Sequence, residues 1–124
     1  MEKIRLKFSA TPSLSPANSV VVDLTLDEEG KSYKAKFAND FLGEQKELLP
    51  LPKRVLDAFT ENAINKILSK DEIPNEPGVM VLDGYSYEIN ISKGDTKKEY
   101  DADDVSIETY PLLRYLASWC RNKL

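Results

Sequence analysis

The stretch that decides the fold reads Leu82-Asp83-Gly84-Tyr85-Ser86-Tyr87-Glu88-Ile89-Asn90-Ile91. Large side chains alternate with polar ones over its last seven residues, and a period of two places the two kinds on opposite faces of a strand. The large side chains should form a buried face, made of Tyr85, Tyr87, Ile89 and Ile91. Asp83-Gly84 is a turn signal, because glycine adopts positive φ and aspartate binds its own backbone. We therefore expect a strand from Gly78 to Leu82 that pairs with this one as a hairpin.

Other segments show the same alternation. Residues 4–8, 19–26 and 33–37 each place apolar side chains at every second position, which predicts three more strands. Turn residues separate the second and third of them, at Asp27-Glu28-Glu29-Gly30. After a further turn at Lys93-Gly94-Asp95, residues 96–100 read as a short charged strand suited to a sheet edge.

Two segments have a helical period instead. From about Pro52 to Ser69, apolar residues recur every three or four positions, and Pro52 suits the first turn of a helix. The last element runs from about Pro111 to Arg121, with Cys120 on its apolar side and Thr109 as the expected cap. Residues 39–51 are irregular and predict no regular element.

The order of these elements predicts an α+β fold. We expect a single-layer antiparallel sheet of five or six strands with two helices packed on one face, in the order βββα-βββα. The length of 124 residues suits one domain covering 1–124. A duplicated half-domain, residues 1–70 and 71–124, is a second interpretation of the same order.

Composition indicates a soluble cytoplasmic protein. No apolar run approaches the roughly 20 residues that a membrane-spanning helix needs, and the charged residues 2–8 do not resemble a secretory signal. The lone cysteine, Cys120, cannot form an internal disulfide, which fits a reducing compartment. It reads as a small buried hydrophobic residue rather than a nucleophile.

The side-chain repertoire excludes many kinds of site. The chain has no histidine and one cysteine, which excludes histidine-based catalysis, histidine metal sites and a zinc cluster within one chain. Gly30-Lys31-Ser32 resembles the end of a phosphate-binding loop, but Thr25 stands where the leading glycine belongs. We expect no catalytic residues and no cofactor.

A calcium-binding loop starting at Asp101 does not match the EF-hand pattern. Val105 stands where an oxygen ligand is needed, and Leu112 where a glutamate should close the site, so the pattern fails. A looser calcium site made of Asp101, Asp103 and Asp104 stays as an alternative, although we expect no metal.

Acidic charge is concentrated in residues 71–108, which carry eleven acidic and three basic side chains. One interpretation is a solvated loop. The other is an electronegative surface that attracts a basic protein. On the second interpretation the partner-binding residues are Asp101, Asp103, Asp104 and Glu108. The favoured function is a small interaction module without catalytic activity, such as an acidic inhibitor or immunity-type protein that masks a basic partner.

Two other functions are compatible with the sequence, and a third is not expected. The chain could bind a small ligand, or act as a minor enzymatic domain, through a pocket between sheet and helices with hydroxyls from Tyr85, Tyr87 or Tyr110. It could self-associate through the 96–100 edge strand. We do not expect nucleic-acid binding, because the interleaved aromatic residues face away from the basic side chains that would contact it. Those basic side chains are Lys3, Arg5, Lys7, Lys34 and Lys36.

Overall fold

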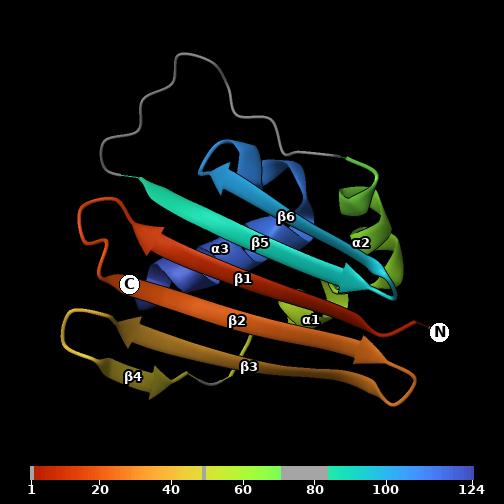
Figure 1. Cartoon of the computed structure of the whole chain (residues 1–124), viewed down its shortest axis with the longest axis horizontal. Helices are drawn as coiled ribbons and strands as arrows, with labels where there is room; N and C mark the ends of the chain where they lie inside the picture. The colour runs from red at the N-terminus through yellow and green to blue at the C-terminus, as the bar shows by residue number, and fades with distance from the viewer. Residues whose placement is uncertain (1, 49, 71–83) are drawn as a thin grey trace.

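The computed structural model describes residues 2–48, 50–70 and 84–124. Its strands form one six-stranded sheet in the order β4-β3-β2-β1-β5-β6, and every neighbouring pair is antiparallel (Figure 1). The strands are β1 (Ile4–Pro12), β2 (Asn18–Asp27), β3 (Gly30–Asn39), β4 (Glu44–Glu47), β5 (Tyr85–Lys93) and β6 (Thr96–Asp103). The antiparallel sheet and the α+β class predicted from the sequence are confirmed.

The two halves of the chain meet at β1. This strand lies between β2 and β5, so that Leu6 is the cross-strand partner of Leu24 on one side and of Ile91 on the other. All three side chains are buried, and their pairing makes the amino-terminal and carboxy-terminal strands parts of one continuous sheet.

The helices lie behind the sheet in the view of Figure 1. They are α1 (Lys53–Ala58), α2 (Glu61–Leu68), the short 3₁₀ helix η1 (Ser106–Thr109) and α3 (Pro111–Lys123). None of the helices in the described part of the chain has the length and apolar character needed to cross a membrane.

The single helix expected over residues 52–69 is wrong, because the structure divides it into α1 and α2. The break falls at Phe59 and Thr60, where Thr60 has extended backbone dihedrals and its hydroxyl accepts a hydrogen bond from the amide of Ala63. Threonine is a favoured residue at this capping position. The change of direction still leaves Phe59 and Ile64 fully buried, so both short helices contribute to the core.

Three further details differ from the expected order. Strand β4 was not predicted, since all four of its side chains are exposed and no apolar alternation marks it. Thr109 lies in η1 and does not cap α3, which begins with Pro111 after an extended Tyr110. The strand expected from Gly78 to Leu82 lies outside the described residues.

The core fills the space between the sheet and the helices. Every second side chain of the longer strands points into it, as the alternating burial of β1, β2 and β5 shows. Tyr87, Ile89 and Ile91 are buried there and Tyr85 is partly buried, as the alternation in residues 82–91 predicts. The other side chains of the strands lie on the face turned away from the helices.

Candidate functional site

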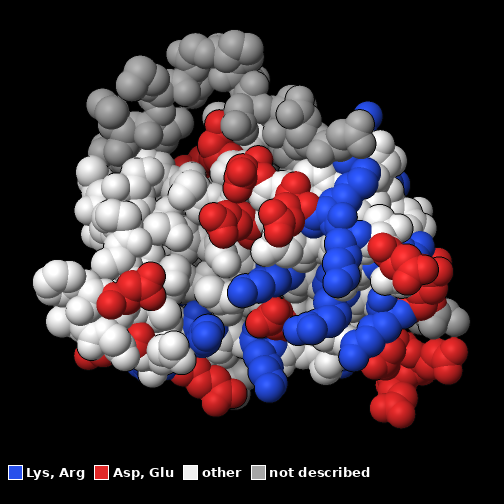
Figure 2. Space-filling model, in the orientation of Figure 1, with Lys and Arg blue, Asp and Glu red and all other residues white. Residues whose placement is uncertain are grey.

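The candidate site is the open face of the sheet, meaning the face turned away from the helices. Figure 2 views this face and shows acidic side chains gathered beside a band of basic ones. Its central rows, read across β3, β2, β1, β5 and β6, follow from the register of the strands. They are Ser32-Thr25-Arg5-Ser92-Lys97, Lys34-Asp23-Lys7-Asn90-Glu99 and Lys36-Val21-Ser9-Glu88-Asp101.

Three carboxylates form an acidic patch on this face, made of Glu88, Glu99 and Asp101. Glu88 on β5 and Asp101 on β6 are direct cross-strand partners, and Glu99 lies two residues before Asp101 on the same strand. All three are exposed, and none of them forms an ion pair with another described residue. Like charges placed directly opposite each other destabilise a sheet, so this arrangement is unfavourable for the isolated fold.

Two basic side chains stand farther along the same face, one on β1 and one on β6. Arg5 on β1 and Lys97 on β6 both neighbour Ser92, which lies between them on β5. We call these two residues the basic pair. No carboxylate stands directly opposite either of them among the described strands, because the other cross-strand neighbour of Arg5 is Thr25.

A groove follows β5 between these two groups. A depression of about 410 Å³ is lined by the basic pair and by Lys7, Asn90, Ser92 and Glu99 among others. A second depression, of about 270 Å³, is lined by the acidic patch together with Asn90 and Tyr100. The two hollows share Asn90 and Glu99, so they lie side by side along β5, and we call them together the β5 groove. The basic pair lies at one end, beside Asp23, and the acidic patch lies at the other.

The basic side chains of β1 and β3 that were named above as possible nucleic-acid contacts do not form a continuous stripe. A stripe would need β1 and β3 to be neighbours, but β2 lies between them. Asp23 on β2 is the cross-strand partner of both Lys7 and Lys34, so it places a negative charge between them. A continuous cationic track across this part of the face is therefore absent from the described strands.

Asp103, one of the predicted partner-binding residues, is engaged in a turn. Its Oδ1 accepts hydrogen bonds from the backbone amides of Val105 at 3.0 Å and Ser106 at 2.8 Å. The Ser106 amide holds the pKa of the Asp103 carboxyl below its usual value. This carboxylate therefore stabilises the turn between β6 and η1.

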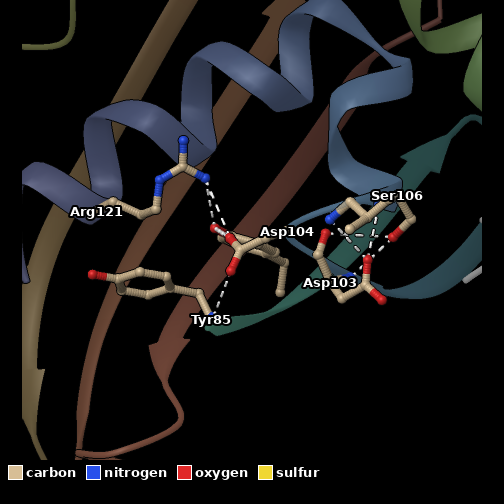
Figure 3. A network of polar contacts seen from close by, with 7 residues as sticks. Tyr85, Asp103, Asp104, Ser106 and Arg121 are labelled. Carbon is tan, nitrogen blue, oxygen red and sulfur yellow. Dashed lines mark hydrogen bonds and ion pairs between the residues drawn. The ribbon is translucent and has the colours of Figure 1, made fainter. Parts of the chain in front are cut away.

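Asp104 turns toward the helices and joins a polar network at the end of β6 (Figure 3). Its Oδ2 accepts a hydrogen bond from the amide of Tyr85 at 2.9 Å, and its Oδ1 one from the hydroxyl of Tyr87 at 2.5 Å. Arg121 of α3 donates to the Tyr87 hydroxyl at 2.9 Å and forms an ion pair of 3.3 Å with Asp104. Burial, together with the hydrogen bond to Asp104, raises the pKa of Tyr87 above its ordinary value.

The four predicted acidic residues therefore do not form one surface. Asp101 lies on the open face, whereas Asp103 and Asp104 bind groups within the chain and Glu108 is exposed on η1. The sequence interpretation missed Glu88 and Glu99 as neighbours of Asp101. Both occupy polar positions of alternating strands, which was a visible signal, but only the β5–β6 register shows that they meet.

The carboxylates considered for calcium do not converge. In the part of the chain that the structure describes, no group of three or more Asp, Glu, Cys or His residues is arranged to hold a metal ion. Asp101 lies on the open face, while Asp103 and Asp104 make the hydrogen bonds given above.

Cys120 is buried on α3, as the sequence indicates. Burial raises the pKa of its thiol to about 12, so the thiol stays protonated at neutral pH. The arrangement therefore offers no activated cysteine nucleophile at this position.

Comparison with protein-family models, curated proteins and solved structures finds no match to this chain.

Proposed function

We propose that this chain is a protein-interaction module without catalytic activity, which binds a basic segment of a protein partner at the acidic patch of the open face. The observation that carries the proposal is the direct opposition of Glu88 and Asp101. An inhibitor or immunity-type protein that masks a basic surface would act in this way.

The like-charge pair gives the proposal its physical basis. Carboxylates directly opposite each other destabilise a sheet, whereas a pair of opposite charges contributes about 0.2–1 kcal/mol, so a bound cation removes the cost of the repulsion. Glu99 adds a third negative charge beside the pair. A patch of one sign also steers an oppositely charged partner and raises its association rate, which falls as salt increases.

The proposal includes a place of action and a form of assembly. We place the protein in the cytoplasm, where the lone Cys120 would stay reduced. Self-association through β6 belongs to the same proposal, because this strand is one edge of the sheet. Sedimentation velocity tests it, and a monomer at high protein concentration would exclude the edge contact.

A small-ligand site between sheet and helices has less support. A hollow of about 220 Å³ beside Tyr110 and Ile67 is lined by residues of the helices and their flanks and by none of the sheet. Its volume is below the roughly 300–1,000 Å³ of ordinary ligand pockets. The hydroxyl of Tyr87, expected to serve such a pocket, already binds Asp104 and Arg121. We therefore place the binding function on the open face.

The first experiment uses a synthetic octalysine peptide as the basic probe. Its binding to the ¹⁵N-labelled protein is followed by NMR at low salt, and we expect shifts concentrated on amides of β5 and β6. The test variant combines Glu88→Gln, Glu99→Gln and Asp101→Asn, and should lose these shifts. A control with the same change in charge, Glu44→Gln, Asp57→Asn and Asp95→Asn, alters three exposed carboxylates outside the patch and should retain them.

The second experiment identifies the natural partner. Affinity capture from the source cells, with mass spectrometry at low and high salt, should recover a basic protein with the wild type and the control but not with the patch variant.

Equal weakening of octalysine binding by the patch variant and by the control variant would contradict the proposal, because it would assign the attraction to net charge rather than to the patch.

A further inference from the structure

We propose that the β5 groove binds an extended peptide segment with basic side chains at positions i and i+2 and an acidic side chain at i+4. This inference rests on the proposed function and specifies the partner's charge pattern. It follows from the separation of charge along the groove, where the acidic patch lies at one end and the basic pair at the other.

The spacing comes from three successive rows of the sheet. The first row holds Glu88 and Asp101, the second holds Glu99, and the third holds the basic pair on either side of Ser92. Rows on one face are two residues apart, so the first and third rows are separated by four residues, or about 13 Å. An extended segment has the same rise and also presents every second side chain to one side.

The floor of the groove suits a polypeptide lying flat. Asn90 and Ser92 have short polar side chains and sit between the longer ones of β1 and β6. Asn90 carries both an amide donor and a carbonyl acceptor, and Ser92 carries a hydroxyl, so both can bind backbone groups of a bound segment. No aromatic side chain stands at these row positions for base stacking, and the acidic patch would repel a nucleic-acid backbone.

Among the described strands, no carboxylate is the direct cross-strand partner of Arg5 or Lys97, although Asp23 and Glu99 line the same depression. Lys7 does have such a partner, since Asp23 stands directly opposite it on β2. Arg5 and Lys97 are therefore the residues assigned to the partner's acidic side chain. Glu88, Glu99 and Asp101 are assigned to its two basic side chains.

Three capped heptapeptides test the pattern by NMR titration at low salt. The matched peptide is Thr-Lys-Thr-Lys-Thr-Glu-Thr, and the rearranged peptide of identical composition is Thr-Lys-Thr-Glu-Thr-Lys-Thr. The cation-only peptide replaces the glutamate with glutamine. We expect the matched peptide to bind about two- to five-fold more tightly than either other peptide, in line with one or two exposed ion pairs.

Variants of the basic pair supply a second readout. The double variant Arg5→Gln and Lys97→Gln should bind the cation-only peptide at least as tightly as the matched one. The control, Lys34→Gln and Lys36→Gln, removes the same charge from β3 on the same face and should keep the preference for the matched peptide.

The outcomes separate this inference from the function on which it rests. If the wild type binds the cation-only peptide as tightly as the matched one, the pattern is wrong while the acidic patch still binds cations. If no peptide and no octalysine binds at low salt, the proposed function itself fails. A dimer in sedimentation that Arg5→Gln alone abolishes would assign the groove to a second copy of the chain and overturn the peptide assignment, because Arg5 lies on the interior strand β1 and not on the β6 edge.

Discussion

The hydroxyl of Tyr87 on β5 lies 2.5 Å from Oδ1 of Asp104, which follows the end of β6. Arg121 contacts both groups, so the pair links the two strands to α3. Tyr87 is 1% exposed. The side chains of Arg121 and Asp104 are 29% and 27% exposed, so the network joins a buried hydroxyl to two charged groups that water partly reaches.

Removing the Tyr87 hydroxyl should destabilise the protein. We expect Tyr87→Phe to lower the free energy of unfolding by about 1.5–3 kcal/mol, the usual range for hydrogen bonds to charged groups. Urea denaturation measures the change. The control is Tyr85→Phe, whose hydroxyl makes no hydrogen bond to another described residue and whose loss should cost less than about 0.5 kcal/mol. Equal effects of the two substitutions would contradict the structural role of the network.

Stability should fall at alkaline pH because of the same tyrosine. The pKa of Tyr87 is raised above its ordinary value of 10.0 in the folded state, so the folded protein holds this proton more tightly than the unfolded chain. The resulting stabilisation is fully present below pH 10.0 and is lost as pH rises from there toward the folded pKa. The melting temperature should therefore fall more steeply between pH 8 and 11 for the wild type than for Tyr87→Phe. Parallel falls in the two proteins would contradict a raised pKa of Tyr87 in the folded state.

Reversing one charge of the acidic patch should stabilise the fold while removing binding. Asp101→Lys places a cation opposite Glu88 and should raise the free energy of unfolding by about 0.2–1 kcal/mol. Asp101→Asn removes the repulsion without adding an attraction, so it should give a smaller gain. Both variants should bind octalysine more weakly. A loss of stability in Asp101→Lys would mean that the opposed carboxylates carry no cost.

Cys120 should be unreactive in the native protein. Its thiol is buried and its pKa is raised to about 12, so thiolate is scarce at pH 8. Ellman's reagent should react slowly without denaturant and stoichiometrically in 6 M guanidinium chloride. The Tyr87→Phe variant removes the hydroxyl that Arg121 binds, and Arg121 directly follows Cys120 on α3. The rate at which this variant reacts with Ellman's reagent tests whether loosening this end of the helix exposes the thiol. Rapid reaction of the native wild type would show that α3 does not protect it.

Part of the candidate site was readable from the sequence. Asp101 was predicted as a partner-binding residue, and its exposure follows from its polar position beside Tyr100 and Ala102. Asp103 and Asp104 belong to the same acidic run, but one binds the amides of a turn and the other binds β5 and α3. Sequence shows that a carboxylate is present and does not show which donors the fold brings to it.

Local patterns determined the elements of this protein. Alternation from Tyr85 to Ile91 predicts a strand with one buried face, because successive side chains of a strand point in opposite directions whatever its neighbours are. The absence of histidine excludes histidine chemistry whatever the fold is, because composition does not depend on folding.

Only the tertiary structure decided how these elements meet. The position of β1 between β2 and β5, the separation of Lys7 from Lys34 by Asp23, and the opposition of Glu88 to Asp101 all follow from strand order and register. Register depends on contacts between residues far apart in the chain, and a shift of one residue would turn every side chain to the other face. The open face and its groove therefore exist only in the assembled sheet.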